Sequence, residues 1–271
     1  MLLVSIFEAI ALGLVQGLTE FFPVSSSGHL KLVQTLFGLE NLSLYLPFDL
    51  VCHLGTIFSI LLVFRKDILS LFQSERKLLF LIVISGLPLL PLYPFLSYIK
   101  RIYDFPQILG GFFLCTALLL YLGEKFTFPR RPDKKGHRVF YDAFTIGVFQ
   151  AVALMPGISR SGATISAASM LGWKKDEAAR FSFLMSVPPI LGGVAIELRT
   201  LLSGKAIVAE IPISHYFIGF SVSFAVGLMA LLGVLHLVKK KSLLPFAWYC
   251  AILGVLSLIY LNFLNPMVTN G

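Results

Sequence analysis

The chain has 271 residues, of which 57% are hydrophobic and only 13% charged, and its mean hydropathy is +0.86. This composition excludes a soluble globular domain, whose surface needs far more polar residues, and it indicates a polytopic membrane protein. The net charge of +8 does not predict a nucleic-acid partner, because basic residues of a membrane protein first report loop topology and contact with membrane lipids.

The N-terminal region predicts two short helices in place of one spanning helix. Residues 8–22 and 26–38 would form helices of only about 22 and 20 Å, against a hydrocarbon core of roughly 30 Å. The sequence PVSSS separates them. Irregular backbone at membrane depth is tolerated only when it is buried in protein or lines a wet cavity. We therefore expect a re-entrant hairpin with a polar tip.

That tip carries polar groups where water is scarce: Gln16, Glu20, Ser25, Ser26, Ser27 and His29. Gln16 and Glu20 are four residues apart and share one helix face. Ser25 is a natural N-cap, so the free backbone N–H groups after it predict an anion site. Capping alone is an equally good explanation of Ser25. A charge near the bilayer centre is costly, which makes Glu20 a candidate functional residue.

Three apolar stretches follow, and we expect them to span the membrane at 47–64, 78–99 and 105–123. Prolines interrupt the second of them. Asp49 and His53 lie four residues apart on the first span. They could support the site from beside it, or they could be a structural pair that holds the hairpin. A basic loop, 126–139, comes next and is predicted to be cytoplasmic.

A second pair of short helices is predicted at 142–155 and 159–171, with PGISRSG at the break. Arg160 supplies a planar cation suited to bidentate phosphate contact. Three nearby residues add hydroxyl groups: Ser159 and Ser161 flank Arg160, and Thr164 lies one helical turn beyond it. Three further spans follow at 177–199, 211–238 and 243–264, with Pro188–Pro189 interrupting the first of these.

The two predicted hairpins resemble each other in sequence. A shift of 134 residues places 8–30 on 142–164 with six identities in 23 positions, including Gln16 on Gln150 and Ser25 on Ser159. Each half then holds one hairpin and three spans, and because three is odd the halves must be inverted. We expect a single all-α membrane domain with six transmembrane helices and two re-entrant hairpins, arranged as repeats at about 1–125 and 140–271.

The basic residues predict the orientation. They concentrate in the loops after the first, third and fifth spans, including Arg130, Arg131, Lys134, Lys135 and Lys241, whereas the opposite side has few, such as Lys205. By the positive-inside rule, those loops are cytoplasmic and both termini are extracytoplasmic. The hairpins then enter from opposite sides, and their tips can meet near the midplane. One tip offers a carboxylate, hydroxyls and an imidazole, and the other a guanidinium and hydroxyls, which together predict a phosphate site.

The motifs at the two tips resemble those of a known family. QGLTEFFPVSSSGH resembles the [E/Q]xxxE and PxSSxGH region of undecaprenyl-pyrophosphate phosphatases of the bacitracin-resistance type. PGISRSGAT is similar to that family's PGxSRSxxT motif, and FDLVCHLGT (48–56) is similar to the segment after the first motif. The order and separation of the motifs extend the resemblance over essentially the whole chain.

The resemblance implies an enzyme of the bacterial plasma membrane. It would remove the terminal phosphate of undecaprenyl pyrophosphate, recycle the lipid carrier for cell-wall synthesis and confer bacitracin resistance. It would use a divalent cation, Mg²⁺ or Ca²⁺, and open to the extracytoplasmic side. A lipid flippase or transporter built on inverted repeats is the alternative. The resemblance leaves open whether the chain works alone or as a homodimer.

Motif positions also imply the role of each residue. Glu20 and Gln16 would hold the metal, Ser26 would be the nucleophile with His29 or Glu20 as proton acceptor, and Arg160 would bind phosphate. Ser25, Ser27, Ser159, Ser161 and Thr164 would contribute further phosphate contacts. Gln16 stands where many members have Glu, and a neutral amide cannot act as a base, so the ionised role falls to Glu20. A route in which Glu20 activates water and Ser26 only binds phosphate stays open.

Overall fold

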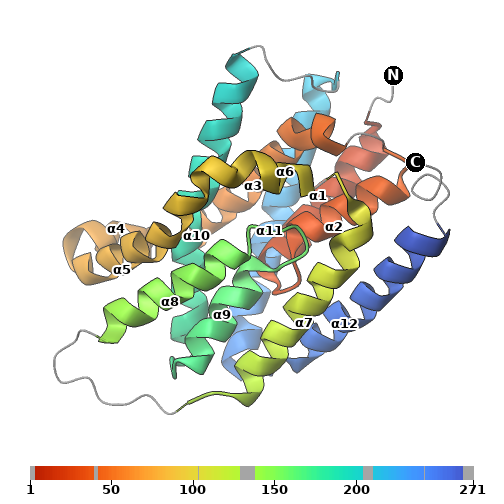
Figure 1. Cartoon of the computed structure of the whole chain (residues 1–271). Coiled ribbons are helices and arrows are strands. Elements are labelled where there is room, and N and C mark those ends of the chain that lie inside the picture. The colour runs from red at the N-terminus through yellow and green to blue at the C-terminus, as the bar shows by residue number, and fades with distance from the viewer. Residues whose placement is uncertain are drawn as a thin grey trace.

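The computed structural model describes residues 4–39, 42–102, 104–128, 138–203, 210–240 and 242–264. These residues form helices joined by short connections, and none of them belongs to a β-strand (Figure 1), which confirms the predicted all-α class. In chain order the helices are α1 (Ile6–Phe21), α2 (Ser26–Leu36), η1 (Leu42–Tyr45), α3 (Leu46–Val63), α4 (Arg65–Gln73), α5 (Arg76–Gly86), η2 (Leu87–Phe95), α6 (Leu96–Ile102), η3 (Pro106–Ile108), α7 (Leu109–Lys125), α8 (Arg138–Val152), α9 (Arg160–Met170), α10 (Lys175–Leu202), α11 (Ile213–Lys240), α12 (Leu244–Ile259) and η4 (Tyr260–Leu264).

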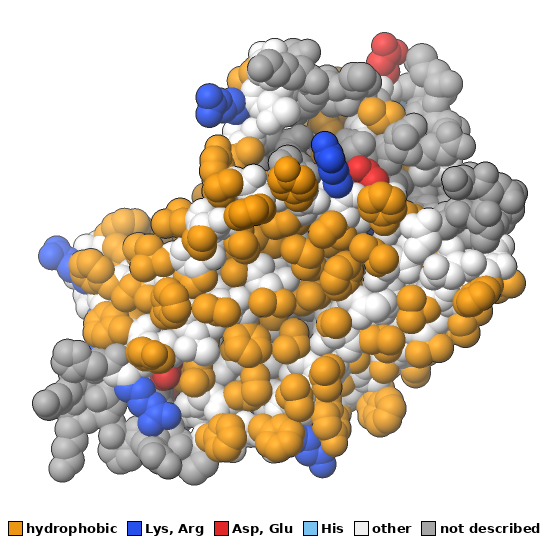
Figure 2. Space-filling view, viewed as in Figure 1, with side chains coloured by type: hydrophobic (Ala, Val, Ile, Leu, Met, Phe, Trp, Pro, Cys, Tyr) orange, Lys and Arg blue, Asp and Glu red, His pale blue; other side chains and the backbone are white. Residues whose placement is uncertain are grey.

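Six described segments are long and apolar enough to cross a membrane, and each overlaps one predicted span. They are Leu46–Val63, Arg76–Phe95, Pro106–Lys125, Lys175–Thr200, Ile213–Val238 and Leu244–Leu264. Figure 2 shows one face of the molecule, on which apolar side chains cover the middle while Lys and Arg lie toward the periphery. A lipid-facing surface has this pattern, because the bilayer core favours apolar contact. The chain is a multi-pass membrane protein.

Prolines in the interior of the second and fourth spans act differently. In the second span, Pro91 and Pro94 lie inside the 3₁₀ stretch η2, where the regular α-helical hydrogen bonds are replaced. The prediction that Pro188–Pro189 interrupt the fourth span was wrong, because α10 is one continuous helix from Lys175 to Leu202. A proline has a helix-compatible φ, and two adjacent prolines remove only neighbouring hydrogen bonds, which a packed membrane helix tolerates.

Two pairs of short helices stand apart from the spans. α1 and α2 have 16 and 11 residues, and α8 and α9 have 15 and 11. At 1.5 Å per residue none reaches the roughly 30 Å needed to cross the hydrocarbon core. The predicted N-cap Ser25 is confirmed, since its hydroxyl accepts from the Gly28 amide at 3.3 Å. Ser159 caps α9 in the same way, with its hydroxyl accepting from the Gly162 amide at 3.0 Å.

Small residues let the first helix of each pair approach a spanning helix closely. A Cβ atom on Gly13 of α1 would lie 3.0 Å from the carbonyl oxygen of Gly219 in α11. A Cβ atom on Gly147 of α8 would lie 2.3 Å from the carbonyl oxygen of Ser85 in α5. Such contacts allow backbones in membranes to pack without intervening side chains. These contacts hold α1 against α11 and α8 against α5.

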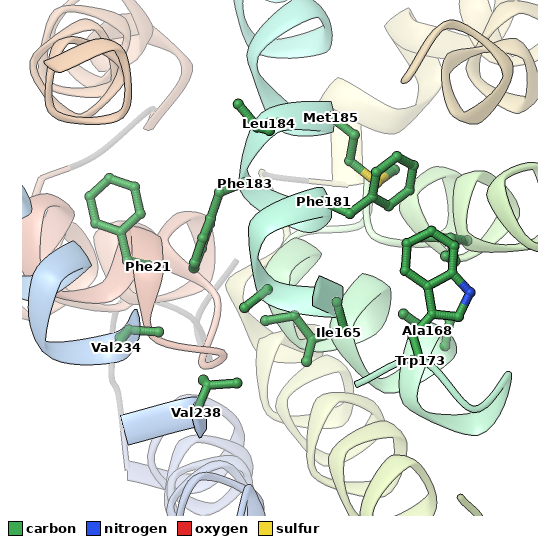
Figure 3. Packing of buried hydrophobic residues seen from close by; sticks show 14 of the residues in the cluster. Phe21, Ile165, Ala168, Trp173, Phe181, Phe183, Leu184, Met185, Val234 and Val238 are labelled. Carbon is green, nitrogen blue, oxygen red and sulfur yellow. The ribbon is translucent and has the colours of Figure 1, made fainter. Parts of the chain in front are cut away.

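The largest apolar cluster packs around α9 and the first half of α10. Figure 3 shows Phe183 of α10 facing Phe21 at the end of α1, and their rings meet edge to face with centroids 5.8 Å apart. Trp173 packs on Phe181 at 5.2 Å and donates from Nε1 to the Asp142 carboxylate at 2.9 Å. The first contact anchors the end of α1 beside the first helix break, and the second joins the end of α9 to the start of α8, at the base of the second helix pair.

Candidate active site

The two helix breaks meet inside the protein. A Cβ atom on Gly28 would lie 2.8 Å from the Cα atom of Gly157, which has φ +92°, and 2.8 Å from the Phe113 ring. The Ser161 hydroxyl lies 3.3 Å from the carbonyl oxygen of Phe22 and donates to it. The structure thus brings the first tip, residues 22–28, against the second tip, residues 153–162.

We expect Gly28→Ala to separate the tips. Its added methyl group would meet backbone at Gly157, which has no flexible side chain to move aside, and overpacking of this kind costs about 1–3 kcal/mol. The melting temperature in detergent should fall by several degrees. Gly111→Ala is the matched control, because a Cβ there meets nothing within 4 Å; an equal loss in both variants would contradict the contact.

Glu20 lies at the centre of the contact between the tips. Its side chain is 3% exposed. One carboxylate oxygen, Oε1, is ion-paired and hydrogen-bonded to the Arg160 guanidinium from the other tip. The other, Oε2, accepts from the Ser26 hydroxyl at 2.5 Å and from the Gln16 amide at 2.9 Å. The structure therefore brings together four of the predicted site residues.

His53 is the imidazole that lies beside this carboxylate. Its Nε2 is 3.8 Å from Glu20 Oε2. Its Nδ1 is 2.8 Å from the backbone carbonyl oxygen of Asp49, which can only accept, so Nδ1 carries the proton and Nε2 faces Glu20. Asp49 itself is held by the buried Lys31 and Gln34, with its carboxylate oxygens 3.3 Å and 2.7 Å from their nitrogens. Sequence reasoning left the role of His53 open and did not select Lys31 or Gln34.

His29 occupies a different place from the one its motif suggests. Its Nδ1 is 2.7 Å from the Ser25 carbonyl oxygen, and its Nε2 is 2.7 Å from the Tyr249 hydroxyl. The ring stacks on Tyr249 and meets Phe113 edge to face. Both ring nitrogens are thus engaged away from Ser26, and the structure does not bring His29 together with Glu20.

Of the remaining predicted hydroxyl residues, some line the site and one packs behind it. Ser25, Ser27, Ser159 and Ser161 line the same cavity as Ser26 and Arg160. Thr164 instead contacts the Ser182 hydroxyl at 2.6 Å and the Arg160 carbonyl at 2.8 Å, behind the tip. Thr116 accepts from the Ser159 amide and donates to the Gly157 carbonyl, so it fixes the second tip. No sequence signal distinguishes Thr116 from other threonines in apolar spans.

The cavity has a polar end and an apolar wall. Its volume is about 460 Å³, and Glu20, Ser26, His53 and Arg160 line its polar end. Lys31, Asp49, Arg101 and Asp104 also line the cavity, and most of the remaining lining is apolar, including Leu50, Leu89, Leu96, Ile158, Ile190 and Val194. A ligand with a small anionic group and an apolar chain fits this division of polarity.

The site offers few side-chain oxygens for a cation. The described residues include no group of three or more His, Cys, Asp or Glu side chains suited to a metal. Glu20 offers one carboxylate, and Gln16 has a buried Oε1 atom with no hydrogen-bond partner, because its Nε2 faces Glu20. These oxygens fit Mg²⁺ or Ca²⁺ where phosphate oxygens complete the shell.

Fold and site together define a polytopic helical membrane protein with a buried polar site suited to phosphate and an attached apolar cavity. The chain belongs to the bacitracin resistance protein BacA family, whose model matches residues 9–256 and so includes both tips. It is similar to proteins named undecaprenyl-diphosphatase from several bacteria. That of Protochlamydia amoebophila is 46% identical over 259 residues, which cover 94% of this chain and 98% of that protein. Those of Bacteroides fragilis (strain YCH46) and Carboxydothermus hydrogenoformans are each 40% identical, and the matches cover 93% of this chain and 97% and 96% of those proteins.

Proposed function

We propose that this protein hydrolyses the terminal phosphate of undecaprenyl pyrophosphate to give undecaprenyl phosphate and inorganic phosphate. The names of its relatives and the family's link to bacitracin resistance support this activity. The observation that carries it is the Ser26 hydroxyl, 2.5 Å from Glu20 Oε2 with the Arg160 guanidinium on the same carboxylate. A nucleophile, a proton acceptor and a phosphate-binding cation thereby meet in one buried site.

In the first step, Ser26 Oγ attacks the terminal phosphorus and its proton passes to Glu20. Arg160 turns from Glu20 to the phosphate oxygens, which frees the carboxylate to accept that proton. The bond from phosphorus to the bridging oxygen breaks, and lipid monophosphate leaves with the proton from Glu20. Water then attacks the Ser26 phosphoester, giving one proton to Glu20, from which Ser26 regains it as inorganic phosphate departs. His53 Nε2 lies 3.8 Å from Glu20 Oε2, beside the carboxylate that accepts these protons.

Glu20 and Gln16 would hold a divalent cation together with the substrate phosphates. When bound, such an ion neutralises charge that develops on the transferring phosphoryl group. Before substrate arrives, both Glu20 oxygens are already engaged by neighbouring side chains. The cation is therefore expected to bind with the pyrophosphate and not ahead of it.

We place both termini and the cavity mouth on the extracytoplasmic side. Among the described residues, the side assigned to the cytoplasm holds Arg65, Lys66, Arg76, Lys77, Lys125, Arg138, Lys174 and Lys175, and the other side holds the buried Lys31 of α2, Arg101 of α6 and Arg199 of α10. Arg101 and Asp104 line the cavity. The start of α1 and the end of α12 lie toward one end of the molecule, and the end of α7 lies toward the other (Figure 1). The predicted loop residues Arg130, Arg131, Lys134, Lys135, Lys205 and Lys241 lie outside the described residues.

We further propose that the two short helix pairs are re-entrant hairpins of an inverted repeat. The contacts of Gly13 with Gly219 and of Gly147 with Ser85 support it, because both partners shift by 134 residues, as the sequence repeat does. The two N-caps obey the same shift.

Phosphate release from undecaprenyl pyrophosphate by the purified protein in detergent tests the proposal. Detergent provides no second compartment, so a protein that only moves lipid across a membrane would release none. We expect release that depends on Mg²⁺ or Ca²⁺ and that stops with a chelator. Absence of release from folded protein with either ion would overturn the proposed activity.

A further inference from the structure

The turn that leads into α2 has an unusual backbone. Among the described residues, Ser25 is the one non-glycine with positive φ, at φ 74° and ψ 95°. A residue with a Cβ atom rarely adopts this conformation, and it persists only where surrounding contacts hold it. Ser25 is 4% exposed and directly precedes Ser26.

The other tip shows that helix capping does not require this conformation. Ser159 caps α9 through the same hydrogen bond, in which its hydroxyl oxygen accepts from the amide three residues on, but it has φ −71° and ψ 119°. The two caps correspond in the sequence repeat and differ in backbone. The feature particular to the first tip is the residue after the cap, because Ser26 must reach back to Glu20 in the last turn of α1.

We propose that Ser25 is a positioning residue whose left-handed backbone acts as an elbow that presents Ser26 to Glu20. The proposal rests on the proposed function for the role of Ser26. The elbow reverses the chain between α1 and α2, and Ser26 Oγ comes to 2.5 Å from Glu20 Oε2.

Neighbouring contacts hold the elbow on both sides. Before it, the Val24 amide donates to the Phe22 carbonyl at 2.8 Å, and Phe22 is tied to the second tip through Ser161. After it, the Ser25 carbonyl accepts from the His29 amide at 3.2 Å and from His29 Nδ1 at 2.7 Å. His29 thereby orients the peptide that joins Ser25 to Ser26. This gives the histidine of the PVSSSGH motif a role that acts through Ser25, without contact with phosphate.

Glycine and alanine substitutions of Ser25 and Ser159 distinguish a role of the Ser25 backbone from ordinary helix capping. Both replacements remove the hydroxyl and both are smaller than serine, but only glycine adopts positive φ without strain. We expect kcat of Ser25→Gly to exceed that of Ser25→Ala by at least about tenfold with similar KM, since small misplacements of a nucleophile are costly. The ratio for Ser159→Gly and Ser159→Ala should stay near one. Ser25→Asn, which caps and tolerates positive φ, should resemble Ser25→Gly or exceed it.

Thermal unfolding in detergent tests the elbow independently of activity. Ser25→Gly should melt about 2–4 °C above Ser25→Ala, a larger gap than between the two Ser159 variants. If wild type releases no phosphate, the proposed function fails while this melting comparison still tests the elbow. Equal melting gaps at both caps, or a kcat of Ser25→Ala equal to that of Ser25→Gly, would overturn the proposal.

Discussion

Arg160→Ala is expected to abolish phosphate release and to destabilise the fold. Its guanidinium is the cation paired with Glu20, whose side chain is 3% exposed. Removing one partner of a buried ion pair leaves an uncompensated charge and typically costs about 3–5 kcal/mol. The substrate also loses its planar phosphate ligand, and comparable arginine contacts contribute about 10³–10⁵-fold to phosphoryl transfer. Phosphate release and thermal unfolding, measured on the same preparation, check both effects.

The double variant Glu20→Gln with Arg160→Met separates the two effects. It has no buried charge to compensate, and replacing a buried ion pair with neutral groups is often neutral or stabilising. We expect it to melt near the wild-type temperature while phosphate release stays absent. If Arg160→Ala melts like wild type, or if the double variant melts no higher than Arg160→Ala, the ion pair is not what holds the tips together.

Ser26→Ala is expected to lower phosphate release by at least roughly a thousandfold, because the attacking oxygen is lost. The fold should change little, since the Ser26 hydroxyl donates to a carboxylate that keeps its Arg160 and Gln16 partners. Acid quenching of wild type during turnover should trap phosphate on Ser26, detectable by mass spectrometry of the peptide.

Ser27→Ala is the matched control for the nucleophile. Ser27 lines the same cavity on the next residue of α2, so its loss should reduce release by about tenfold, the effect of one hydrogen bond to phosphate. A Ser26→Ala variant with only such a small loss, and no trapped phosphoserine, would show that water attacks phosphorus directly and that Ser26 binds it.

The spans and both tips were predictable because strong local signals encode them. Six long apolar stretches gave six candidate transmembrane helices, since hydropathy over about 20 residues has few alternative explanations. Glu20 and Arg160 stood out as charges in apolar surroundings, and their pairing agrees with the meeting of two polar breaks. The continuity of α10 across Pro188–Pro189 was not predictable, because packing decides whether a proline breaks a membrane helix.

Which histidine approaches Glu20 depends on tertiary structure. The motif position of His29 implied a proton acceptor for Ser26, but its Nε2 lies 2.7 Å from the hydroxyl of Tyr249 in α12, 220 residues away in sequence. His53 comes from α3 and reaches Glu20 only through helix packing. The positive φ of Ser25 could not be predicted from the sequence either, because a serine also caps α9 with an ordinary, extended backbone.

The most direct test compares phosphate release from undecaprenyl pyrophosphate by wild type with release by the double variant Glu20→Gln with Arg160→Met, in one detergent with Mg²⁺ or Ca²⁺. We predict cation-dependent release by wild type and at least a thousandfold less by the double variant, with both proteins melting at similar temperatures. Release by the double variant within tenfold of wild type would contradict a catalytic site formed by the two tips.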